Sequence, residues 1–159
     1  IFQPDDRHQL SEFLAWVKPL MPKDRAQSAR IIRIPNRGST DTEYPSISIN
    51  SHASLRALSD RMGMPVSPLR WRGNIWIDDL VPWTEQSWLG QKFSIGSVVL
   101  EGVEPIVRCL ATTANPRTGK RDADTLGALK DGWNHQNFGL YARVIESGEI
   151  SIEDTLELL

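Results

Sequence analysis

The sequence predicts a mainly β domain, a closed or partly open barrel with two or three flanking helices. Three observations favour this fold class. Seven or eight short segments rich in β-branched and aromatic residues are separated by Gly, Pro and polar turns. Helical spacing of apolar residues occurs in only two or three places. The strands do not alternate regularly with helices, as a parallel α/β sheet would require.

Composition limits the classes of protein to which this chain can belong. Its 159 residues fit one domain with a real core. A net charge of −2 gives no sign of general binding to nucleic acids or anionic membranes. One cysteine allows no internal disulfide, which indicates a reducing, cytoplasmic location and argues against a structural zinc site. No signal peptide or membrane-spanning run is expected.

The first 29 residues are predicted to be a linker or the remnant of an N-terminal domain, followed by the barrel domain over residues 30–159. Leu10, Phe13, Leu14 and Val17 follow helical spacing, and prolines end the pattern. The barrel domain is expected to begin with a short strand over residues 30–35, which contain three isoleucines.

A strand followed by a capped helix is predicted over residues 45–62. Residues 45–50 alternate apolar and polar, Ser51 is a suitable N-cap, and Gly63 ends the helix. Asn50 would then lie at a strand end close to free backbone amides. Such a corner can hold an anion or the polar edge of a ring, although it is more often a simple connection.

Residues 69–78 are predicted to form a strand with two arginines on one side. Arg70 and Arg72 would share a face, and Asn74 would continue it. Paired guanidinium groups can bind a phosphate or carboxylate in bidentate fashion. The alternative is a solvated face with ion pairs to nearby acids.

The only cysteine lies in a stretch predicted to be a strand, residues 103–113, which follows a hairpin through Gly96. Val107 and Cys109 would then share one face, with Arg108 on the other. A lone thiol in this setting can fill the core, which is its usual role, or act as a soft metal ligand. A helix over residues 124–133 and strands over residues 138–145 and 155–159 complete the expected elements.

Several common catalytic motifs are missing from the sequence. It contains neither a Gly-rich phosphate loop nor a HExxH zinc motif. The three histidines are too scattered to indicate a metal cluster. A nucleophile pair of Cys109 with His52 or His135 stays open on sequence alone.

Taken together in order, several short pieces resemble the MOSC family, named for the C-terminal domain of molybdenum cofactor sulfurase. The resemblance runs from about Tyr44 to the C-terminus and is closest to the amidoxime-reducing and YcbX-like proteins. The matching pieces are residues 45–50 with Ser54 and Leu55, Arg-Trp-Arg-Gly-Asn at 70–74, Glu85 with Trp88, Arg-Cys at 108–109 with Thr112 and Thr113, Asn-Pro-x-Thr-Gly at 115–119, Phe-Gly-Leu-Tyr at 138–141 and residues 148–154.

The resemblance implies a barrel that binds the pterin-based molybdenum cofactor, with Cys109 as the metal ligand. Further cofactor contacts are implied for Arg70, Arg72, Asn50, Asn74, Arg108 and Thr113. Arg70 or Arg72 suits the cofactor's phosphate, and the two asparagines suit the pterin edge. Arg108 could instead help to hold the barrel together or lower the pKa of the Cys109 thiol from nearby. Val107 departs from the reductase branch, which often has a polar residue there.

The activity implied is reduction of N-hydroxylated or N-oxide small molecules, with electrons from a separate iron–sulfur or haem protein. The alternative is a non-redox module that binds the cofactor or carries sulfur as a Cys109 persulfide. A third possibility is a β domain with a buried Cys109 and no cofactor.

Overall fold

The computed structural model describes residues 2–3, 6–35 and 40–159 and groups the chain into two units, Ile1–Gly38 and Ser39–Leu159. In the first unit α1 spans Leu10–Val17, as predicted, between the 3-10 turns η1 (Arg7–Gln9) and η2 (Lys18–Leu20). The prediction of a strand over residues 30–35 is wrong, because these residues pair with no strand in the described part of the chain. Whether residues 1–29 are the remnant of another domain stays a prediction.

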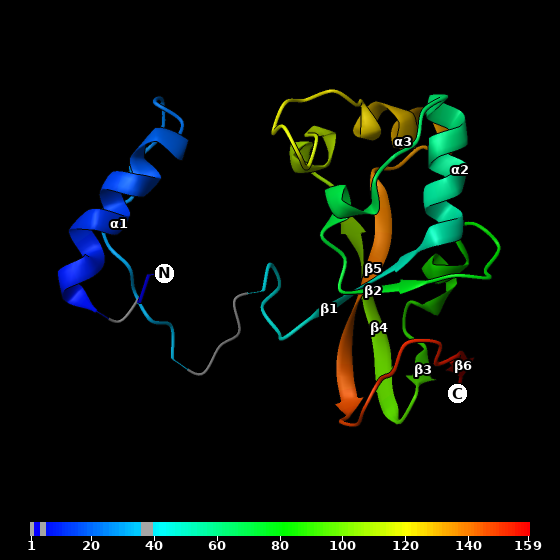
Figure 1. The fold of residues 1–159 in the computed structure, drawn as a ribbon. Coiled ribbons are helices and arrows are strands. Elements are labelled where there is room, and N and C mark those ends of the chain that lie inside the picture. The colour runs from blue at the N-terminus through cyan, green and yellow to red at the C-terminus, as the bar shows by residue number, and fades with distance from the viewer. Residues whose placement is uncertain (1, 4–5, 36–39) are drawn as a thin grey trace. The chain divides into compact units, whose positions relative to one another are not determined.

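The second unit is built on one curled sheet of six strands, which forms a half-barrel (Figure 1). Its strands are β1 (Ile47–Ser51), β2 (Ile75–Ile77), β3 (Lys92–Ile95), β4 (Val98–Val107), β5 (Asn137–Glu146) and β6 (Leu156–Leu158). Their order is β2-β1-β5-β4-β3-β6, with only β1 and β2 parallel. The partly open barrel is therefore confirmed, with fewer strands in the described residues than the seven or eight expected.

Two capped helices lie at one end of this sheet. The Ser51 hydroxyl accepts a hydrogen bond from the Ser54 amide and begins α2 (His52–Met62), which ends at Gly63 in the left-handed conformation. Asp124 caps α3 (Thr125–Trp133) in the same way. Both helices were predicted with these caps. Among the described helices, none has the length and apolarity needed to cross a bilayer.

Two clusters of buried side chains hold the second unit together. One fills the concave part of the sheet around Trp88, Phe93 and Leu100. The other lies between the sheet and the two helices, where Leu58 and Leu129 meet Trp71 and Phe138. The rings of Trp71 and Phe138 stack with 3.9 Å between their centroids. The second cluster therefore fixes the backbone of the segment that carries Arg70 and Arg72.

Two expected strands are shorter than predicted, and both differences affect the candidate site. Residues 68–71 form a 3-10 turn, η3 (Pro68–Trp71), because Ser67 caps it and Pro68 suits its first position. β4 ends at Val107, and a second 3-10 turn, η5 (Leu110–Thr113), begins directly after Cys109. The expected alternation of faces for Arg70, Arg72 and Cys109 is therefore wrong.

A buried carboxyl group connects α2 to the segment before β3. Glu85 lies in the 3-10 turn η4 (Thr84–Trp88) and is fully buried. One of its oxygens accepts a hydrogen bond from the Ser54 hydroxyl at 2.9 Å, and the other has no partner among the described residues. Burial raises the pKa of Glu85 above its ordinary value of 4.5, although the Ser54 hydrogen bond opposes this.

We expect Glu85→Gln to make the protein less sensitive to rising pH. A raised pKa in the folded state favours folding at low pH, and this contribution is lost as pH rises through the folded pKa. Each unit of elevation corresponds to about 1.4 kcal/mol. The variant should therefore gain stability over the wild type as pH rises above the ordinary glutamate pKa of 4.5, measured as urea midpoints at a series of pH values. Glu146→Gln, at an exposed position on β5, is the control. Parallel pH profiles for Glu85→Gln and wild type would contradict the assignment.

Candidate functional site

A pocket of about 490 Å³ opens where η3, the end of β4 and η5 meet. This volume lies in the range of sites for small molecules and cofactors. Five of the seven residues predicted from the sequence line it, namely Arg70, Arg72, Asn74, Arg108 and Cys109. Asn50 and Thr113 are buried and do not line the pocket. Separate segments of the sequence are thus brought to one cavity.

Cys109 presents an exposed thiol at this pocket. The residue is the N-cap of η5, with extended backbone, and its carbonyl accepts hydrogen bonds from the amide and hydroxyl of Thr112. The turn thus holds the main chain at Cys109 while the residue stays exposed at the pocket. The interpretation of Cys109 as a core residue is wrong.

Arg108 forms the inner wall of the pocket through hydrogen bonds to neutral groups. Its Nε donates to the Phe138 carbonyl at 2.8 Å and its Nη1 to the Trp71 carbonyl at 2.9 Å. Its Nη2 donates to Asn50 Oδ1 at 2.7 Å. The guanidinium also lies over the rings of Trp71 and Phe138. It makes no ion pair with a carboxylate of the described residues.

Burial lowers the pKa of Arg108 to about 10. The side chain therefore stays cationic at neutral pH, and no carboxylate of the described residues forms an ion pair with it. A partly buried cation of this kind at a pocket wall attracts an anionic group.

Asn50 is fixed between two glycines, behind the pocket wall. A Cβ atom at Gly73 would lie 2.1 Å from its Nδ2, and one at Gly139 would lie 2.4 Å from its Oδ1. Gly139 also has φ +75°, which side chains rarely adopt. Asn50 Nδ2 has no hydrogen-bond partner among the described residues. Asn50 therefore orients Arg108 directly.

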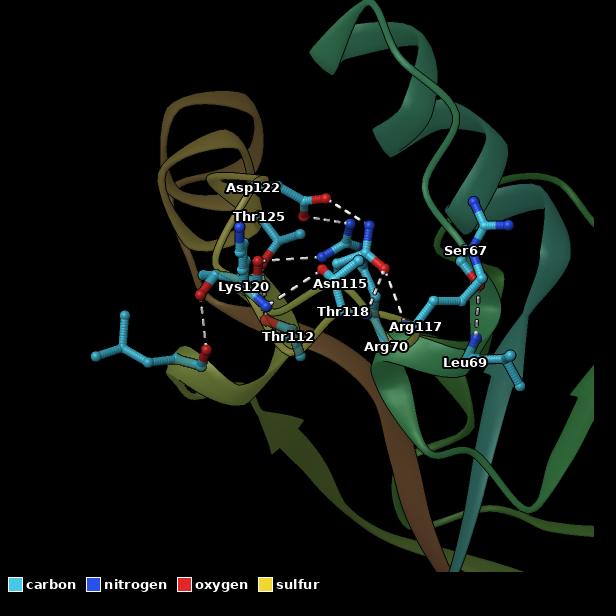
Figure 2. A network of polar contacts seen from close by, with 12 residues as sticks. Ser67, Leu69, Arg70, Thr112, Asn115, Arg117, Thr118, Lys120, Asp122 and Thr125 are labelled. Carbon is cyan, nitrogen blue, oxygen red and sulfur yellow. Dashed lines mark hydrogen bonds and ion pairs between the residues drawn. The ribbon is translucent and has the colours of Figure 1, made fainter. Parts of the chain in front are cut away.

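Arg70 fastens η3 to the chain that follows η5 (Figure 2). Its Nη1 donates to the Thr113 carbonyl at 3.1 Å, and its Nη2 contacts the Asp122 carboxylate at 2.5 Å. Asp122 also accepts a hydrogen bond from Asn115 Nδ2 at 2.6 Å. The Nε of Arg70 is buried and has no partner among the described residues. Two of its three nitrogens thus bind protein, and the guanidinium clamps residues 113–122.

Because Arg70 clamps this segment, we expect Arg70→Met to be cleaved faster by trypsin. Arg117, Lys120 and Arg121 are exposed trypsin sites in the clamped segment. Without the guanidinium the segment should open more often, and we expect cleavage there to accelerate about tenfold. Mass spectrometry of the fragments identifies the bonds cut. The matched control is Arg56→Met, which removes an exposed ion pair with Asp78. Equal cleavage rates in the two variants would contradict the clamp.

The remaining predicted residues have different surroundings. Arg72 is exposed, has φ 52° and lines the pocket without a hydrogen bond or ion pair to the described residues. Asn74 Oδ1 accepts hydrogen bonds from the amide and hydroxyl of Ser48, which ties the start of β2 to β1. The Thr113 hydroxyl donates to the Leu110 carbonyl inside η5. Of these three, Arg72 alone offers a free cation to a ligand.

Sequence reasoning missed two aromatic residues of the pocket. Tyr141 lies on β5, and burial, together with the nearby Asp41 carboxylate, raises its pKa. Trp71 has a buried indole N–H that lacks a partner in the described part of the chain. Residues two apart on a strand share a face, so Tyr141 lies on the same face of β5 as the buried Gly139. This alternation could have identified Tyr141 from the sequence. No local pattern identified the Trp71 nitrogen.

Among the described residues, no group of three His, Cys, Asp or Glu side chains could hold a metal ion. A metal at this pocket would therefore need ligands beyond Cys109. A cofactor that brings its own sulfur donors would meet this requirement.

A family model and several curated relatives all point to one family for this chain. The model of the MOSC domain matches residues 40–157. The chain is 32% identical over 131 residues to "Molybdenum cofactor sulfurase" of Caenorhabditis elegans, covering 77% of this chain and 18% of that protein. It is 34% identical over 104 residues to "Mitochondrial amidoxime-reducing component 1" of Mus musculus, covering 64% of this chain and 30% of that protein.

Solved structures show the same fold. The crystal structure of YiiM from Geobacillus stearothermophilus has a TM-score of 0.54 at 18% identity, covering 71% of this chain and 53% of that one. YiiM from Escherichia coli gives 0.52 at 19% identity, covering 71% and 53%. The chain spans less than half the length of the curated relatives described above.

Proposed function

This chain belongs to the MOSC domain family, and on that premise we propose that it binds the molybdenum-pterin cofactor in the pocket beside Cys109. We further propose that it serves an oxidoreductase that removes oxygen from N-hydroxylated or N-oxide compounds. The observation that carries the proposal is the exposed Cys109 thiol at the pocket that Arg108 lines. The Cys109 thiolate is a soft donor of the kind that a metal held by sulfur ligands prefers. The Arg108 guanidinium, which has no carboxylate partner among the described residues, can bind the anionic pterin that carries the metal.

The residues at the pocket fit such a group. Arg70 Nε and Trp71 Nε1 are buried donors that have no partner among the described residues, and both side chains line the pocket. Arg72 adds an exposed guanidinium. The cofactor has a terminal phosphate and a pterin ring rich in hydrogen-bonding groups. Cations suit the phosphate, and the unused N–H donors suit the ring acceptors.

Each side chain has a definite role in this proposal. When bound, the cofactor supplies two-electron redox chemistry at molybdenum. Cys109 provides a soft thiolate donor to the metal, and Arg72 and Arg108 hold anionic parts of the carrier. Tyr141 lines the pocket, and its phenol is protonated at neutral pH even at the ordinary tyrosine pKa of 10, which burial raises further. It would donate a hydrogen bond to an oxygen in the pocket. Arg108 holds Asn50 and the Trp71 backbone in register behind these groups.

The test is direct. The protein is expressed in a host that makes the cofactor, and molybdenum and pterin are measured per chain. Reduction of an N-hydroxylated substrate is then followed with a small chemical reductant. Metal together with turnover supports the proposal, and a chain without molybdenum refutes it. A redox partner protein and a cytoplasmic location both remain predictions.

A second candidate function is sulfur transfer through a Cys109 persulfide. The exposed thiol favours it, because accessible cysteines accept sulfur. The name of the Caenorhabditis elegans relative, a sulfurase, points in the same direction. The protein is incubated with a small-molecule persulfide, whose outer sulfur passes to the Cys109 thiolate while the rest leaves as a thiol. Mass spectrometry should then find about 32 Da, the mass of one sulfur atom, added at Cys109. A persulfide without molybdenum or turnover would favour this function over the first.

A further inference from the structure

We propose that the loop of residues 115–121 is a docking surface for an acidic electron-carrier protein. The inference rests on the redox function proposed above and adds the place where electrons arrive. The loop has the sequence Asn-Pro-Arg-Thr-Gly-Lys-Arg, with three cations and no acid, in a chain whose net charge is −2. We call it the basic loop.

The three cations of the basic loop are available to a partner. Arg117, Lys120 and Arg121 are exposed, and none forms an ion pair within the described part of the chain. The two acids that follow are occupied elsewhere. Asp122 is held by Arg70 and Asn115, and Asp124 caps α3. Among the described residues, no ion pair thus neutralises the positive charge of the loop.

The basic loop is also held in a defined shape. The amide of Asn115 donates to the Lys120 carbonyl at 2.8 Å, and the Gly119 amide donates back to the Asn115 carbonyl at 2.8 Å. The Asn115 side chain accepts from the amide of Arg117 at 2.9 Å. Figure 2 shows how this turn joins the Arg70–Asp122 contact. Because the backbone is already ordered, docking loses less entropy than it would with a loose tail.

The basic loop lies beside the proposed redox site. It leaves η5 two residues after Thr113, and the preceding residues Ala111 and Thr112 line the pocket that Cys109 shares. η3 and η5 pack against each other and expose Leu69 and Leu110, at 71% and 53%. Apolar side chains next to a charged rim are typical of a protein interface. An acidic partner seated here would approach the pocket directly.

The proposed reaction needs two electrons, which two one-electron carriers can deliver one after the other. Removal of a hydroxylamine oxygen as water breaks one N–O bond and forms one N–H bond. The step consumes two electrons and two protons, and the protons come from solvent. Two reduced carriers, docking in succession, each lose one electron. Acidic carriers are steered to cationic sites by long-range attraction that salt screens.

The test compares a carrier with a small reductant. The triple variant Arg117→Glu/Lys120→Glu/Arg121→Glu is assayed with two acidic carriers, a plant-type [2Fe–2S] ferredoxin and a small haem protein, and with reduced methyl viologen. At low ionic strength we expect the KM for a carrier to rise by about tenfold or more. Viologen-driven turnover should not change. The wild-type KM should rise with salt, and the variant's KM should respond less.

Matched variants separate charge from folding. Lys120→Glu should raise the carrier KM, whereas Lys92→Glu on β3, outside the pocket and the basic loop, should not. Arg117→Lys/Arg121→Lys keeps the charge and should behave like the wild type. If both carriers ignore the charge reversals while viologen turnover persists, the inference fails and the proposed function stands. If the triple variant loses pterin, the loop serves the cofactor instead. Absence of viologen turnover in the wild type would remove both proposals.

Discussion

Replacing Cys109 with serine is expected to remove most of the molybdenum from the purified protein without unfolding it. The thiol is exposed and forms no hydrogen bond with the described residues, so the exchange leaves packing unchanged. A serine hydroxyl is a hard, neutral donor and a poor ligand for a metal that a soft thiolate would hold. We expect metal content to fall on the order of 10- to 100-fold. Elemental analysis per chain measures it, and the thermal midpoint reports the fold.

The neighbouring Ala111→Ser is the matched control, since it adds a hydroxyl to the same pocket but keeps the thiol. It should retain molybdenum. Pterin content adds a second readout, because Arg72 and Arg108 remain in place to hold the carrier. Cys109→Ser should then retain more pterin than metal. Equal molybdenum in Cys109→Ser and wild type would defeat the assignment of Cys109 as ligand.

The sequence predicted correctly those helices whose ends carry recognisable capping residues. Ser51, Gly63 and Asp124 cap helices where expected, since each satisfies backbone groups within a few residues of itself. The prediction of a strand over residues 30–35 was wrong because a strand needs a pairing partner, which β-branched composition alone does not provide. The strand expected over residues 69–78 failed at its start, where the Ser67–Pro68 turn signal outweighed alternation.

The sequence predicted five of the residues that line the pocket, but it did not predict how they are arranged. Arg72 and Cys109 line one pocket as the resemblance implied, although the strand faces used to place them were wrong. The fit of Asn50 between Gly73 and Gly139 depends on three separate segments. The different contacts of the three arginines also depend on tertiary structure. Arg70 and Arg108 are anchored to protein groups, whereas Arg72 is exposed and has no hydrogen bond or ion pair with the described residues.

These different contacts make Arg108 the arginine whose loss should cost most. In Arg108→Met the carbonyls of Trp71 and Phe138 and the side-chain oxygen of Asn50 lose their donor inside the protein. Each orphaned acceptor costs about 1–3 kcal/mol. Removing a partly buried cation, whose pKa burial has lowered to about 10, offsets part of that cost. We expect a net loss of about 3 kcal/mol in the free energy of unfolding.

Urea unfolding, followed by tryptophan fluorescence, measures this loss against Arg143→Met. Arg143 is on neighbouring β5 and has an exposed ion pair with Glu101, so its variant should lose less than about 1 kcal/mol. Arg108→Lys should fall between them, because an ammonium keeps the charge but cannot direct three donors at three fixed acceptors. If Arg108→Met unfolded at the same urea concentration as Arg143→Met, the guanidinium would not be what holds this wall. Cofactor retention should follow the same order, since the wall that Arg108 holds is the one that Cys109 faces.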